Sequence, residues 1–190
     1  MKFNYQNIVG SLFRNDLPVF DNMDAYIDYL LPHIKPYGES LTNQNLFINK
    51  RWKEFRDDED FHEAVLYIFQ DDEDQSLLLS IDGNIGIGGW STLPKSNTLI
   101  IESGGKKQKS ELFDLAFLNS DFLILRKHGN QKRIDKKKYL ILASEKSCGK
   151  LDWLDLMEKV YDLYRNNWLF TTMIFLFLLV FGLLLFSIFL

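Results

Sequence analysis

The stretch SLLLSIDGNIGIGGWS, residues 76–91, decides the fold of the middle of this 190-residue chain. Leu77 and Leu79 alternate with polar residues, which is the two-residue period of a strand with one buried face. The dipeptide Asp82-Gly83 follows, and such a pair is typical of a tight turn between antiparallel strands. The stretch is therefore predicted to form a β-hairpin.

The same period continues on both sides of this hairpin, from residue 46 to residue 144. The apolar runs are separated by short links, which favour antiparallel neighbours over helical crossovers. The predicted strands are Leu46–Trp52, Ala64–Phe69, Ser76–Asp82, Ile85–Ser91, Thr98–Glu102, Glu111–Phe117, Phe122–Lys127 and Tyr139–Ser144. Eight short strands in succession can remove their edges by closing, so we expect a small antiparallel up-and-down β-barrel.

The predicted barrel resembles small bacterial lipocalin-like domains in the order of its motifs. These motifs are Trp52, Asp82-Gly83, Gly89-Trp90, Leu99 with Ile101, and the FLIL run Phe122–Leu125. The N-terminal GxW motif of true lipocalins is not matched, because Trp52 lies in NKRWKEF. The resemblance covers about residues 46–145 and implies the barrel alone, without an inherited ligand pocket.

Helical periods flank the predicted barrel on both sides. Asp21 or Asn22 can cap a helix with apolar residues at three- and four-residue spacing, and Pro32 is expected to bend or end it. We therefore expect a mainly β fold with flanking helices. Its parts are an N-terminal helical arm at 1–45, the barrel at 46–145, an amphipathic juxtamembrane helix at 150–167 and a transmembrane helix at 168–190.

The transmembrane prediction comes from the uncharged stretch WLFTTMIFLFLLVFGLLLFSIFL, residues 168–190. As a helix it would be about 35 Å long, against roughly 30 Å for a hydrocarbon core. Lys150, Lys159 and Arg165 precede it, and no Lys or Arg follows. The positive-inside rule then predicts a single-pass, tail-anchored protein of the inner (cytoplasmic) membrane with its N-terminal domain in the cytosol. The candidate anchor residues are Trp168, Phe170, Phe175, Phe177, Phe181, Gly182, Phe186 and Phe189.

Two further stretches are candidates for interaction. One is the apolar stripe Trp153, Leu156, Val160 and Leu163, which either packs on the protein's own barrel or binds a protein partner or a second copy. The other is the basic stretch 126–138, with Arg126, Lys127, Lys132, Arg133, Lys136, Lys137 and Lys138. Attraction to lipid headgroups would explain these positive charges, and so would a hairpin tip whose charges are simply solvated. The lack of interleaved aromatic residues argues against nucleic acid as a partner.

The sequence nominates no catalytic, cofactor-binding or metal-binding residue. The glycines of DGNIGIGG are not followed by a helix or by GK[ST], so they predict a bulge or a tight barrel corner rather than a phosphate loop. The two DDED runs at 57–60 and 71–74 lack the calcium-loop pattern. The histidines have no metal-ligand spacing, and Cys148 is the one cysteine.

These observations lead to two functional hypotheses. The first is a tail-anchored, non-enzymatic interaction or adaptor subunit of a membrane assembly, with lipid bilayer and protein as partners. The alternative is a barrel that senses a small-molecule ligand, nucleotide or lipid, and is coupled to the transmembrane helix, as in a membrane effector of bacterial defence. A filled barrel favours the first hypothesis, and a hollow one favours the second.

Overall fold

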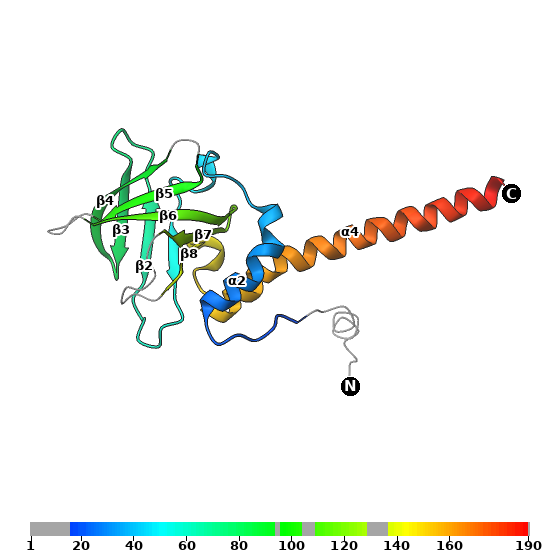
Figure 1. Ribbon diagram of the computed structural model, residues 1–190, viewed down its shortest axis with the longest axis horizontal. Helices are drawn as coiled ribbons and strands as arrows, with labels where there is room; N and C mark the ends of the chain where they lie inside the picture. Colours follow the sequence, from blue (N-terminus) through cyan, green and yellow to red (C-terminus); the bar gives the residue numbers. More distant parts are fainter. Residues whose placement is uncertain (1–15, 94–95, 104–108, 129–136, 190) are drawn as a thin grey trace.

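The computed structural model describes residues 16–93, 96–103, 109–128 and 137–189, with the side chains at 103, 166–171 and 186–189 left out of the description. A barrel lies at one end of the molecule, and one long helix runs away from it (Figure 1). The helical elements are α2 (Met23–Ile34), η1 (Lys35–Tyr37), η2 (Gln44–Leu46), α3 (Glu145–Cys148) and α4 (Trp153–Phe189). The strands are β1 (Trp52–Phe55), β2 (Val65–Phe69), β3 (Ser76–Ile81), β4 (Asn84–Thr92), β5 (Thr98–Ser103), β6 (Lys109–Leu118), β7 (Phe122–Lys127) and β8 (Tyr139–Ser144).

The eight strands form a closed antiparallel barrel in which each strand pairs with the next in sequence. Strand β8 returns to β1, with Trp52 opposite Ser144 and Phe55 opposite Ile141. The predicted antiparallel up-and-down barrel is thus confirmed. At the β3–β4 turn, Asp82 and Gly83 both have positive φ, 48° and 86°, as a two-residue hairpin turn requires.

The first predicted strand, Leu46–Trp52, is wrong. Residues 44–46 form the short helix η2, and the strand begins only at Trp52. Between the two elements Asn49 has a φ of 54°, a left-handed conformation that interrupts an extended chain. This break lets Phe47 turn into the barrel, where its side chain is fully buried.

One end of the barrel is filled by aromatic side chains. The rings of Phe47, Phe69 and Trp90 pack edge to face with centroids 5.4 to 5.9 Å apart. The Trp52 indole donates a hydrogen bond of 2.8 Å to the carbonyl of Phe47, and the Trp90 indole donates one of 3.0 Å to the carbonyl of Gln70. This end is therefore a packed plug whose polar atoms have partners.

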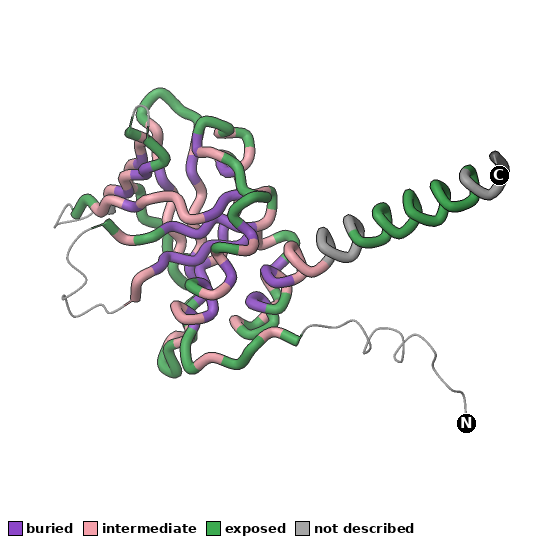
Figure 2. The backbone as a smooth tube through the Cα atoms, turned by 45° about the vertical axis from the view of Figure 1, so that its right-hand side comes forward, coloured by how far each residue is buried: buried purple, intermediate pink, exposed green. Residues whose placement is uncertain are grey.

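Helices α2 and α4 cover the outside of the barrel at β7, β8 and β1. Phe122, Ile124 and Ile141 point outward into a second core that these helices complete. Strands β7 and β8 are therefore buried on both faces, which explains why their sequences are continuous apolar runs. Figure 2 shows the buried residues gathered in the barrel and at the base of α4.

Helix α2 follows its sequence signals closely. The Asn22 side chain accepts a hydrogen bond of 2.9 Å from the Ala25 amide, so the predicted cap is present. Pro32 lies in the last turn, and the helix ends at Ile34. Tyr26, Ile27 and Leu30 form its buried face.

Helix α4 is one continuous helix, but its two halves have different surroundings. Near its start Leu156 and Val160 are fully buried, whereas side chains from residue 172 to residue 185 are exposed, as the green tube in Figure 2 shows. Among the described residues, no helical segment combines the length and the apolar composition needed to traverse a bilayer. The predicted transmembrane span at 168–190 is corrected accordingly, and the fold is a β-barrel with flanking helices.

Candidate functional site

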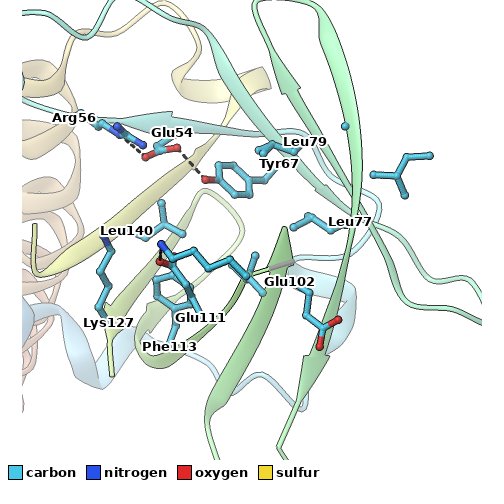
Figure 3. Close-up of a pocket in the computed structure, with 15 residues that line it drawn as sticks. Glu54, Arg56, Tyr67, Leu77, Leu79, Glu102, Glu111, Phe113, Lys127 and Leu140 are labelled. Atoms are coloured by element: carbon cyan, nitrogen blue, oxygen red, sulfur yellow. Dashed lines mark hydrogen bonds and ion pairs between the residues drawn. The ribbon is translucent and has the colours of Figure 1, made fainter. Parts of the chain in front are cut away.

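The open end of the barrel holds a cavity of about 180 Å³, opposite the aromatic plug (Figure 3). All eight strands contribute to its wall. The lining residues include Glu54, Arg56, Tyr67, Leu77, Leu79, Gly86, Gly88, Ile101, Glu102, Lys109, Glu111, Phe113, Lys127 and Leu140. The cavity has room for on the order of ten water molecules. The barrel is thus filled at one end and hollow at the other.

The hollow end exists because strand β4 carries glycines on its inner face. Gly86 and Gly88 share a face with Trp90, since side chains two residues apart point the same way. Where Trp90 fills the barrel, the two glycines leave it open. The sequence interpretation of a bulge or barrel corner missed this role. The sequence did contain a signal, because Gly86, Gly88 and Trp90 follow one another at two-residue spacing and therefore lie on one face of the strand.

Glu54 is the most buried charged group in the cavity, with 4% of its surface exposed. It lies two residues after Trp52 on β1 and therefore points into the barrel. Arg56 Nε donates a 2.5 Å bond to one carboxylate oxygen, and the Tyr67 hydroxyl donates a 3.0 Å bond to the other (Figure 3). Burial and the neighbouring Glu54 charge raise the pKa of Tyr67 far above its usual value, so the hydroxyl remains a donor.

The opposite wall carries a second ion pair. Lys109 Nζ lies 2.5 Å from a carboxylate oxygen of Glu111 on β6, and Lys127 lines the cavity from β7. Glu102 is at the rim, but it follows the inward-facing Ile101 and points away from the other charged side chains in Figure 3. The inner wall therefore combines two carboxylates with three cations.

A smaller cavity of about 30 Å³ adjoins the first and shares Glu54, Arg56, Lys127 and Leu140 with it. It extends to Asp57, whose carboxylate accepts a 2.7 Å hydrogen bond from the Met23 amide at the start of α2. Asp57 also forms an ion pair with Lys137. Burial alone would raise the pKa of Asp57, but the bonds from Lys137 and Met23 hold it below its usual value.

The predicted basic surface is only partly described. Arg126 lies 3.6 Å from Asp114, Lys137 pairs with Asp57, and Lys138 Nζ lies 2.5 Å from Asp28. Lys127 faces the cavity. Lys132, Arg133 and Lys136 lie outside the described residues. Arg126, Lys137 and Lys138 thus form ion pairs within the fold, and Lys127 lines the cavity.

The predicted apolar stripe of the C-terminal helix lies against the protein's own α2. Leu156 and Val160 are fully buried in that core, and Trp153 and Leu163 pack against it. Of the predicted anchor residues, Phe175, Phe177 and Phe181 are exposed, and a Cβ added at Gly182 would meet nothing within 4 Å. The side chains of Trp168, Phe170, Phe186 and Phe189 lie outside the described ones.

The other motifs of the sequence have local roles. Asp72, in the second DDED run, accepts a 2.6 Å bond from the Ser76 amide and closes the turn before β3. His33 packs between Tyr29 and Tyr164, and His128 contacts Asp114. In the described ranges, no group of three or more His, Cys, Asp or Glu side chains is placed to hold a metal ion.

Comparison with protein-family models, with curated proteins and with solved structures finds no match to this chain.

Proposed function

We propose that this protein is a non-enzymatic, ligand-sensing barrel that binds a small polar molecule at its open end. The observation that carries the proposal is the cavity between the glycines of β4 and the buried Glu54. A barrel built only for packing fills its interior with its own side chains. This chain does so around Trp90 and omits side chains at Gly86 and Gly88, next to a carboxylate already fixed by two donors.

We further propose that the barrel is of the lipocalin-like kind. A closed up-and-down barrel of eight strands, plugged at one end and open at the other, suits a carrier or sensor of one small ligand. Trp52 supports this proposal, because it lies at the start of the first strand and anchors the plug through its bond to Phe47.

A ligand in the cavity can affect the position of α4 through a short series of contacts. Arg56 lines the cavity, and the next residue, Asp57, binds the first amide of α2. Helix α2 packs against α4 through Tyr26, whose ring lies 5.9 Å from that of Trp153, and through Leu30. A shift of Arg56 would therefore alter the contact that fixes the start of α2, and α2 holds the base of α4.

Filling the cavity is the direct test of the proposed site. Gly86→Val places an isopropyl group inside the barrel, where a new Cβ would lie 3.8 Å from the Leu79 carbonyl oxygen, an ordinary contact. The variant is expected to fold, since valine favours strands, and to bind ligand at least roughly tenfold more weakly. Binding is measured by thermal-shift screening of a metabolite panel, followed by calorimetry on each hit.

Gly89→Val is the matched control, because Gly89 is on the outer face of the same strand and a Cβ there would lie 3.6 Å from the Glu102 carboxylate. It is expected to bind like the wild-type chain. Equal binding by the two variants would place the ligand outside the barrel, and a complete lack of hits would remove the proposed function.

A second function is favoured by the exposed half of α4. Large apolar residues are exposed from Met173 to Leu185. Exposure of this kind marks an interaction surface in a protein otherwise covered with polar groups. We propose that these residues contact lipid at the cytoplasmic face of the inner membrane and that the barrel serves there as an interaction or adaptor subunit.

Vesicle flotation tests this second proposal. The full chain is expected to float with phospholipid vesicles, and a chain ending at residue 165 is expected to stay at the bottom of the gradient. The barrel, α2 and the buried base of α4 precede residue 166, so the shorter chain keeps both cores. If both chains stay at the bottom, lipid is not the partner of α4.

A further inference from the structure

We propose that the cavity takes a small zwitterion, in which a short hydrocarbon joins an ammonium group to a carboxylate or phosphate. This inference rests on the proposed function and names the ligand class of the same site. It follows from the signs, the depths and the apolar surface of the groups that line the cavity.

The signs of the lining charges call for a ligand with both poles. Glu54 and Glu111 face a ligand together with Arg56, Lys109 and Lys127. A simple anion would interact favourably only with the basic groups, and a simple cation only with the carboxylates. An uncharged ligand would remove water from all of these groups without replacing it. A zwitterion offers a partner to both signs.

The depths of the charges orient the ligand. Glu54 is almost fully buried, whereas the side chains of Arg56 and Lys109 are 42% and 66% exposed. Among the described residues, Arg56 and Tyr67 donate one hydrogen bond each to Glu54. A carboxylate has about four acceptor positions, so it can take a further donor. The ammonium group is therefore placed at the deep carboxylate and the anionic group at the cationic rim.

The remaining wall accepts hydrocarbon. Leu77 and Leu79 on β3, Ile101 on β5 and the bare backbone of Gly86 and Gly88 form an apolar side next to the charged one. The volume of about 180 Å³ limits the body between the two poles to a few carbon atoms. Free aminoalkyl phosphates and acidic amino acids have this size and this charge pattern.

Calorimetry on the full-length chain tests the two poles separately. O-phosphoethanolamine is compared with ethyl phosphate, which lacks the ammonium group, and with ethanolamine, which lacks the phosphate. L-glutamate is compared with glutarate in the same way. Each zwitterion is expected to bind, and each single-pole analogue is expected to bind roughly 10- to 100-fold more weakly, as the loss of a charged hydrogen bond predicts.

Glu54→Gln assigns the ammonium pole to its residue. The amide keeps an acceptor for Tyr67 but loses the charge, so O-phosphoethanolamine is expected to bind no better than ethyl phosphate. Glu145→Gln is the matched control. Glu145 lies on α3, pairs with Arg51 and does not line the cavity. This control is expected to keep the difference between the two ligands.

The outcomes separate the ligand class from the proposed function. Ethyl phosphate or glutarate binding to the wild-type chain as tightly as the zwitterions would overturn the zwitterion assignment, and so would an undiminished difference in Glu54→Gln. The zwitterion assignment would also be overturned if a different class of molecule bound the wild-type chain and Gly86→Val blocked that binding. The proposed ligand-sensing function would then remain. The comparison on the wild-type chain holds even if Glu54→Gln fails to fold.

Discussion

Replacement of Trp52 by alanine is expected to lower the free energy of unfolding by about 4 kcal/mol, near the whole stability of many small domains. Trp52 is fully buried and touches the plug at the closed end of the barrel. Its loss leaves a large cavity, and the Phe47 carbonyl loses the indole donor at 2.8 Å. Chemical denaturation followed by circular dichroism measures the change.

Ile87→Ala is the control for this effect. Ile87 is 67% exposed on the outside of the barrel, and its truncation is expected to change the free energy of unfolding by about 0.5 kcal/mol or less. A Trp52→Ala variant within about 1 kcal/mol of the wild-type chain would show that the plug does not hold the barrel closed.

Replacement of Asp57 by asparagine is expected to cost about 2 kcal/mol at neutral pH. Asp57 joins three parts of the fold. It lies two residues after the end of β1, and its carboxylate accepts a hydrogen bond from the Met23 amide and pairs with Lys137. Asparagine keeps one acceptor oxygen and loses the charge. The stability of both chains is measured by chemical denaturation between pH 3 and pH 7.

The difference between the two chains has a defined pH dependence. The pKa of Asp57 is lower in the folded chain than its ordinary value of about 3.9. Its contribution is therefore fully present above that ordinary value and is lost as the pH falls through the folded pKa. The difference should be constant from pH 5 to pH 7 and shrink below about pH 4. Asp71→Asn is the control at an exposed residue, and it is expected to change the free energy of unfolding by about 0.5 kcal/mol or less at neutral pH.

The strands were predictable because their alternation is local. Strands β7 and β8 begin and end at the predicted residues, since each is a short apolar run bounded by polar links. The start of β1 was not predictable in the same way. A left-handed Asn49 and a buried Phe47 divide the predicted strand Leu46–Trp52 into η2 and the start of β1.

The site was less predictable than the fold, because its parts come together only when the barrel closes. Glu54 and Tyr67 lie 13 residues apart on the paired strands β1 and β2, but Glu111 comes from β6, and nothing local marks it as their neighbour. The same holds for Lys137 and Lys138, whose partners Asp57 and Asp28 lie 80 and 110 residues away. These two cations of the predicted basic surface therefore form ion pairs within the fold. The glycines of β4 were visible but were interpreted as backbone features.

The length of α4 has a mechanical consequence. The helix contains 37 residues, which at 1.5 Å per residue gives a rod of about 55 Å. The base of the rod is fixed by Leu156 and Val160 against α2, and no described side chain from 172 to 185 is buried. A tilt of roughly 10° at the base would carry the far end through roughly 10 Å. If ligand binding shifts Arg56 as proposed, a small change at the base of α4 would therefore become a much larger displacement at its far end.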